Sequence, residues 1–152
     1  MSKPFRIVQD LSVAALLGGN LFGRVALNPA LGDVSDKSER GSVLNRAWQR
    51  YGYINSLALL TLVATHLSER LRGETGPGPR DVALGAVAIT GLASAAGGVG
   101  FARQAPGGAV PLDSGSESAP ETADRAAKLK SAVNILGALN LAAEFALLAI
   151  DA

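Results

Sequence analysis

The stretch VALGAVAITGLASAAGGVGFA, from Val82 to Ala102, decides the fold class because it contains no charged side chain. Its only polar side chains are those of Thr90 and Ser94. A helix of a soluble bundle needs a polar face that is turned to water, and this stretch has none. A helix of about 20 apolar residues is long enough to cross the hydrocarbon core of a bilayer. The stretch therefore predicts a membrane-spanning helix.

Three other segments are comparably apolar and long, at residues 8–31, 47–67 and 131–150. Charged residues make up only 18% of the 152-residue chain, below the about 25% that is usual in soluble domains. We therefore predict an all-α polytopic membrane protein, in which residues 1–152 form a single transmembrane domain built as a four-helix bundle. The predicted location is the cell membrane, with several passes.

The connections between these segments are polar. Pro29 is expected to end the first helix, because proline lacks the N–H that a helix interior requires. Residues 103–122 are rich in proline, glycine, serine and acids. Such a composition is typical of loops, so this segment is expected to be flexible.

Composition and motifs exclude several classes of function. The chain has no cysteine and a formal net charge of +1, so thiolate chemistry is excluded and nucleic acid is not an expected partner. His66 is the only histidine, and we expect it at the membrane interface rather than in a metal or haem site. No catalytic constellation is recognisable, so no catalytic residue, metal or cofactor is predicted.

Polar residues recur at helical spacing inside the predicted spans. Charges in a membrane usually face the bundle interior, and residues four apart share a helix face. The sequence therefore predicts an inward polar core, or the lining of a ligand site, made of Asn20, Arg24, Asn28, Tyr51, Asn55, Asn140 and Glu144.

The partner of Arg24 stays open at this stage. Arg24 and Glu144 could form an ion pair, although their levels in the membrane differ by about 10 Å, and Asn20 or Asn140 could bridge the gap. Alternatively, Arg24 extends toward the near interface and bonds Asn28 and groups of the second helix.

Small and aromatic residues give two further predictions. Trp48, Tyr51 and Tyr53 are expected in an interfacial aromatic belt, with a ligand-stacking wall as the alternative. Small residues four apart let helices approach closely, within the bundle or between subunits. The predicted helix-packing residues are Gly19, Gly23, Gly91, Ala95 and Gly98.

Three stretches together resemble a known group of proteins. They are GGNLFGRVALNPAL (18–31), NRAWQRYGYIN (45–55) and KSAVNILGALNLAAEFALLAI (130–150). The pattern resembles small four-helix membrane proteins of the anthrone-oxygenase-like families. The resemblance implies a four-helix transmembrane bundle and, in some members, a cofactorless oxidation of polycyclic phenolic substrates. No catalytic motif matches residue by residue, so no catalytic role is carried over.

These observations leave several hypotheses for function. The leading one is a non-enzymatic accessory or scaffold subunit in the lipid bilayer, which packs with itself as a homo-oligomer or with a larger membrane complex. The small-residue ridges and the missing catalytic set favour it. The alternatives are a binder or carrier of a lipophilic small molecule, an anthrone-oxygenase-like enzyme, and an oligomeric channel or transporter.

Overall fold

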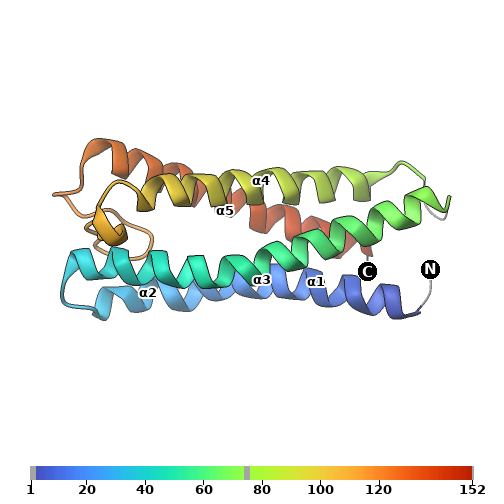
Figure 1. Cartoon of the computed structure of the whole chain (residues 1–152), viewed down its shortest axis with the longest axis horizontal. Coiled ribbons are helices and arrows are strands. Elements are labelled where there is room, and N and C mark those ends of the chain that lie inside the picture. Colours follow the sequence, from blue (N-terminus) through green and yellow to red (C-terminus); the bar gives the residue numbers. More distant parts are fainter. Residues whose placement is uncertain (1–2, 74–75, 152) are drawn as a thin grey trace.

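The computed structural model describes residues 3–73 and 76–151, and over these residues the long elements are all helices (Figure 1). The first helical rod is formed by four consecutive elements, α1, η1, α2 and η2. The bounds are α1 Lys3–Phe22, η1 Gly23–Leu27, α2 Asn28–Ala30, η2 Leu31–Asp33, α3 Lys37–Leu71, α4 Pro79–Ala102, η3 Pro106–Gly108 and α5 Asp124–Asp151.

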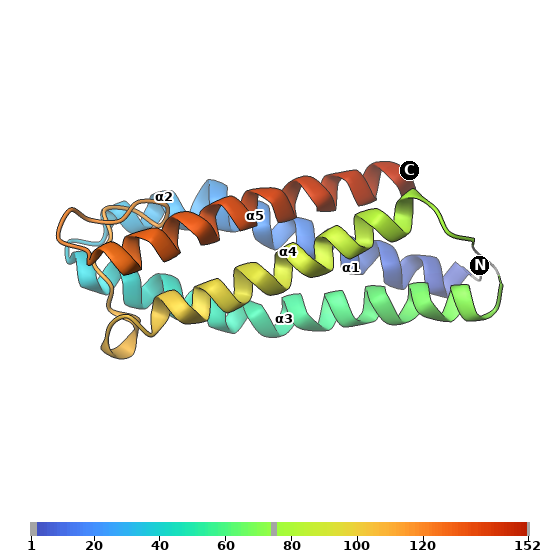
Figure 2. The ribbon, with the colours of Figure 1, turned by 90° about the horizontal axis from the view of Figure 1, so that it is seen from above.

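The first rod, α3, α4 and α5 lie side by side along one common long axis (Figures 1 and 2). The start of α1, the end of α3, the start of α4 and the end of α5 lie at one end of the bundle, which we call the terminus end. The long connection from α4 to α5 lies at the opposite end. We call residues 103–123 the cap and this end the cap end.

Local sequence signals explain where the helices begin. Asp36 caps α3 by accepting a hydrogen bond from the Glu39 backbone N–H at 2.8 Å, as expected for an aspartate in the N-cap position. Pro79 opens α4, where its missing N–H costs nothing.

Pro29 does not end the first rod, contrary to the sequence-based prediction. A π-helical turn at Gly23–Leu27 precedes it, in which the Asn28 N–H bonds the Gly23 carbonyl. The rod then continues through Pro29 to Asp33. The π-helical turn changes the pattern of backbone hydrogen bonds directly before the proline. The helical rod can therefore continue past Pro29.

Three helices are long and apolar enough to cross a membrane, at Phe5–Asp33, Pro79–Ala102 and Asp124–Ile150. The structure therefore supports a helical membrane protein. α3 is not among the three. Its first half is charged, and its second half still carries polar residues such as Asn55, Thr61 and His66.

Apolar side chains nevertheless cover the outside of all four rods. The large exposed apolar residues run over 7–25 in the first rod, 53–71 in α3, 82–99 in α4 and 135–150 in α5. At a rise of 1.5 Å per residue these ranges are each about 22–27 Å long, close to the about 30 Å thickness of a bilayer core. We call this outer zone the apolar belt.

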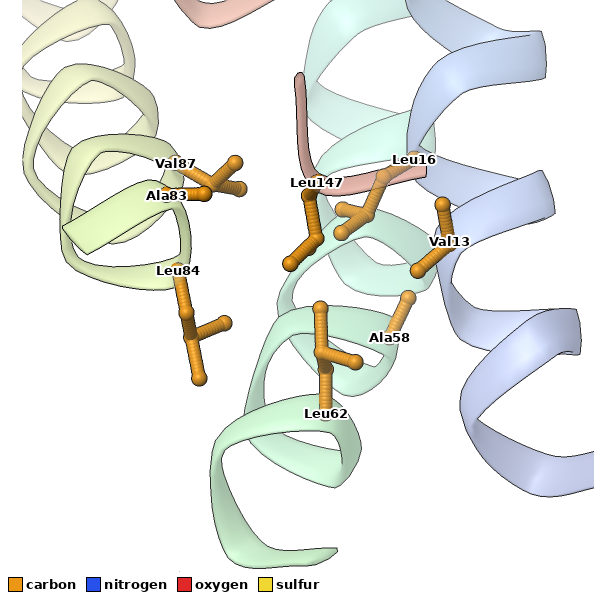
Figure 3. Close-up of a cluster of buried hydrophobic side chains, with 8 residues drawn as sticks. All are labelled: Val13, Leu16, Ala58, Leu62, Ala83, Leu84, Val87 and Leu147. Carbon is orange, nitrogen blue, oxygen red and sulfur yellow. The ribbon is translucent and has the colours of Figure 1, made fainter. Parts of the chain in front are cut away.

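A first hydrophobic core lies between the rods toward the terminus end. Figure 3 shows that its side chains come from the first rod, α3, α4 and α5 and point toward one another. Its members are Val13, Leu16, Ala58, Leu62, Ala83, Leu84, Val87 and Leu147.

The cap is folded against the bundle, whereas the sequence had predicted a flexible loop at 103–122. Leu112 is fully buried, with 0% of its surface exposed, and its N–H donates to the Lys37 carbonyl at 3.0 Å. The few apolar residues of the cap complete a second hydrophobic core with the adjoining helices. Its members are Leu31, Leu44, Phe101, Val110, Leu112 and Ala126.

Polar contacts from α3 hold the cap in place. The Arg40 guanidinium donates hydrogen bonds to the carbonyl oxygens of Gly32, Val34, Leu112 and Asp113 at 2.5–3.3 Å. Lys37 forms an ion pair with Asp113 at 2.8 Å, and the hydrogen bond to Asp113 raises the pKa of the Lys37 ammonium. The sequence signal for a loop was correct, but long-range contacts order it.

Candidate functional site

A hydrogen-bonded network surrounds Glu144 inside the bundle. Glu144 is only 1% exposed, and its Oε1 accepts hydrogen bonds from Asn20 Nδ2 at 2.6 Å and from Asn140 Nδ2 at 2.7 Å. The network therefore joins the first rod to α5. Because the apolar belt surrounds these residues, the network lies in the interior of the membrane-sized part of the bundle.

The network extends to α4 through Thr90. Its hydroxyl oxygen lies 2.9 Å from Asn140 Oδ1 and 2.6 Å from the Ala86 carbonyl oxygen. A hydroxyl has a single hydrogen, so Thr90 donates to one of these acceptors at a time. Glu144 Oε2 is buried and has no hydrogen-bond partner among the described residues. Within the described residues, Glu144 Oε1 therefore accepts two hydrogen bonds, whereas Oε2 accepts none.

Arg24 lies in the π-helical turn η1 and does not reach Glu144. Its Nη2 donates to the Asn134 backbone carbonyl at 3.0 Å. The same nitrogen lies only 3.0 Å from the place where a Cβ on Gly137 would stand, so the missing side chain at this position leaves room for Arg24 against α5. Asn134 and Glu144 are about 15 Å apart along the helix axis. The open question of an Arg24–Glu144 pair is therefore answered in the negative for this structure.

This separation gives a quantitative prediction for a double-mutant cycle. Arg24→Gln and Glu144→Gln should each change stability, but their effects should add to within about 0.5 kcal/mol, because the two side chains share no partner. The measurement is the free energy of unfolding of both single variants and the double variant in one mild detergent. The Asn20→Ala, Glu144→Gln pair is the positive control. A coupling well above this limit between Arg24 and Glu144 would contradict the geometry described here.

Tyr51 and Trp48 pack between α3 and the first rod. The Tyr51 hydroxyl donates to the Ala15 carbonyl at 2.5 Å, and its ring forms an edge-to-face pair with Trp48 at 5.9 Å. Gly19 and Gly23 leave room for the two rings between the helices, and both side chains are half-buried. Their place in an interfacial belt stays a prediction. Tyr53, in contrast, is 75% exposed.

Asn28 and Asn55 lie outside the Glu144 network. Asn28 Nδ2 donates to Ser116 Oγ at 3.3 Å, and its carbonyl accepts from the Gly115 N–H at 2.9 Å. Asn28 therefore ties the first rod to the cap. Asn55 Oδ1 is buried without a hydrogen-bond partner in the described part of the chain.

The predicted helix-packing residues fall into two groups. Gly19, Gly23 and Gly91 lie inside the bundle, the last with its missing Cβ 3.2 Å from Asn140 Oδ1. Ala95 is exposed, and a Cβ on Gly98 would meet nothing within 4 Å. These two residues are therefore free for contacts outside the bundle.

A second polar cluster at the terminus end was missed by sequence reasoning. Glu69 is almost fully buried and pairs with Arg80 at 3.2 Å, and Arg80 also donates to Gln9 Oε1 at 2.8 Å. His66 is buried and lies 2.8 Å from Asp81 Oδ1, and its expected level at the membrane interface stays a prediction. The three-residue spacing of His66 and Glu69, which places both on one face of α3, was the available signal.

The described residues offer no group of metal ligands, and a groove between α1 and α5 lies apart from the predicted polar residues. No group of three or more histidine, aspartate or glutamate side chains in 3–73 and 76–151 could hold a metal ion. A groove of about 210 Å³ lies between α1 and α5. None of the seven predicted polar residues lines it; its lining is Asp10, Val13, Ala14, Leu17 and Leu148.

Comparisons with known proteins add no assignment. No protein-family model, curated protein or solved structure matches the chain significantly. The resemblance to anthrone-oxygenase-like families therefore stays a prediction, and the function is argued below from the geometry.

Proposed function

We propose that this chain is a four-span protein of the cell membrane that acts as a non-enzymatic accessory or scaffold subunit, packing against another copy of itself or a larger membrane complex. The proposal rests on one observation: polar side chains inside the bundle form hydrogen bonds to groups on other helices. Asn20 and Asn140 are both bonded to Glu144, and Arg24 is bonded to a backbone carbonyl. Side chains bonded in this way hold the helices together.

The distribution of apolar surface supports a fourth span at α3. Its exposed apolar residues from Tyr53 to Leu71 match those of the other rods in length and character. The charged first half of α3 instead contacts the cap, through Lys37 and Arg40. A bundle with an apolar outside and a polar inside is stable when lipid surrounds it, because charges in a membrane favour the interior of a bundle.

The outer face of α4 supports close packing with another helix. Ala95 is exposed, and a Cβ placed on Gly98 would meet nothing within 4 Å. The neighbouring Leu92 and Val99 are exposed as well. In membranes, small residues at helix interfaces allow two backbones to approach closely. This surface therefore has the character of a helix-docking face.

A binder of a lipophilic small molecule is the second candidate. Glu144 Oε2 and Asn55 Oδ1 are both buried acceptors without a partner among the described residues. A ligand with an apolar body and a hydrogen-bond donor would satisfy such an acceptor. Enzymatic oxidation of a phenolic substrate would be a special case of this candidate.

Native mass spectrometry of the protein extracted gently from its membrane tests the proposal. We expect an oligomer, or a complex with a second membrane protein, that carries no stoichiometric small molecule other than phosphate or a phospholipid. Gly98→Leu should weaken this assembly about tenfold or more. The larger side chain would keep the two helices apart and so remove packing contacts between them. Ile89→Leu, an exposed substitution of equal volume on the same helix, is the matched control. A ligand-free monomer would contradict the proposal, and a monomer with one bound small molecule would favour the second candidate.

A further inference from the structure

Lys130 is a buried cation at the cap end of α5. Only 5% of its surface is exposed. Its ammonium lies 5.6 Å from the centroid of the Phe101 ring of α4, a contact that stabilises a cation modestly. No described carboxylate pairs with it, and the same is true of Arg24.

Arg24 and Lys130 approach neighbouring turns of α5. Arg24 bonds the carbonyl of Asn134, which is one turn beyond Lys130 on the same face of α5. The two cations therefore lie on neighbouring levels, one on the first rod and one on α5, near the boundary between the bundle and the cap.

The acids of the surrounding segments do not neutralise this pair of charges. Asp113 and Glu121 of the cap are both engaged by Lys37. Glu117 and Asp124 are exposed. Glu144, the acid farther along α5, is bonded to Asn20 and Asn140. Taking a charge out of water is unfavourable unless it is paired, and one bound anion would pair with both cations.

We propose that Arg24 and Lys130 form a binding site for an oxyanion of the phosphate type. The Arg24 guanidinium has five N–H donors and uses one of them on Asn134, and the Lys130 ammonium has three more. A planar guanidinium suits two oxygens of one phosphate, and a lysine adds a point charge. Such a site could exist with or without the proposed scaffold function.

The place of the site in the fold allows two sources for the phosphate group. Val25 and Ile135 are the last exposed apolar residues of the belt toward the cap on their helices. Arg24 and Lys130 flank this edge, at the level where lipid headgroups meet the hydrocarbon core. The group is therefore the phosphate of a membrane lipid or a free phosphate or phosphoester from the aqueous side.

Thermal unfolding of the whole protein in an uncharged detergent tests the site and its source. One arm titrates inorganic phosphate against chloride at equal ionic strength and pH. The other arm titrates a phosphatidic acid against the matching diacylglycerol, which lacks only the phosphate. We expect a saturable rise of the unfolding temperature in at least one arm, since a ligand that binds only the folded state stabilises it. A rise with inorganic phosphate identifies a free oxyanion, and a rise with phosphatidic acid alone identifies a lipid headgroup.

Variants of two neighbouring lysines make the test specific. Lys130→Met should weaken the response to the effective probe about ten- to a hundredfold, the effect of removing a charge-assisted hydrogen bond. Lys128→Met, at an exposed position on the same helix, should leave the response unchanged. Lys130→Glu would place a carboxylate beside Arg24, so this variant should fold without an anion and respond to neither probe.

Two results would overturn the proposal. One is a wild-type protein whose unfolding temperature responds to neither inorganic phosphate nor phosphatidic acid beyond the matched controls. The other is a Lys130→Met or Lys130→Glu protein that folds and responds as strongly as wild type, which would assign the effect to general screening of surface charge.

Discussion

Replacing Gly41 with alanine is expected to release the cap from α3. A Cβ at this position would lie 2.1 Å from the carbonyl oxygen of Val110. That oxygen belongs to the backbone, so a side-chain rotation cannot relieve the clash. We expect a loss of about 3 kcal/mol in the stability of the cap, at the upper end of what overpacking usually costs. Hydrogen exchange at the Leu112 amide, which bonds the Lys37 carbonyl, is the direct measurement.

Gly52→Ala is the matched control on the same helix. A Cβ on Gly52 would meet nothing within 4 Å, and alanine is favoured over glycine within a helix by about 0.5–1 kcal/mol. This variant should keep the protection of Leu112 and be as stable as wild type or slightly more so. Wild-type protection of Leu112 in Gly41→Ala would show that the cap does not depend on this close contact.

Replacing Gly19 with alanine is expected to separate the first rod from α3. The added Cβ would lie 1.9 Å from Tyr51 Cζ and from its hydroxyl oxygen. To make room, the Tyr51 ring must move, which breaks its bond to the Ala15 carbonyl. We expect a loss of about 2–3 kcal/mol in the free energy of unfolding. Trp48, the only tryptophan, packs against Tyr51, so its fluorescence should change as well.

The neighbouring glycine provides the control for this second experiment. A Cβ on Gly18 would meet nothing within 4 Å, so Gly18→Ala should preserve both the stability and the fluorescence of Trp48. Combining Gly19→Ala with Tyr51→Leu should cost less than the sum of the two single changes, because the clash disappears with the ring. Strictly additive costs would mean that Gly19 and Tyr51 do not share this contact.

Some features of the site could be predicted because they depend only on helical spacing. Asn20, Asn140 and Glu144 were expected to face inward, and the structure places all three in one network. Gly19 and Gly23 were expected to be packing positions, and both lie against aromatic rings. Spacing of three or four residues determines the face of a helix, and no knowledge of the fold is needed to read it.

Other features could not be predicted because they depend on where one helix lies along another. Arg24 bonds Asn134, 110 residues away in the chain, and this choice depends on the relative heights of the first rod and α5. The sequence did not single out Lys130 as a site residue, since it lies directly before the predicted span at 131–150. In the folded chain it is a buried cation whose ammonium lies over the Phe101 ring.

The sequence by itself determined that the chain is helical and suited to a membrane, through the charge-free stretch from Val82 to Ala102 and the repeated apolar segments. These are local properties, because hydropathy and helical period are read from neighbouring residues. The tertiary structure alone decided the partners of Arg24, Glu144 and Lys130 and the ordering of the cap. These depend on contacts between distant segments, in which Arg40 binds the carbonyls of Leu112 and Asp113 and Leu112 becomes buried. The polar, proline-rich composition of the cap cannot reveal such contacts, because a few buried side chains and the Arg40 guanidinium are enough to order the cap.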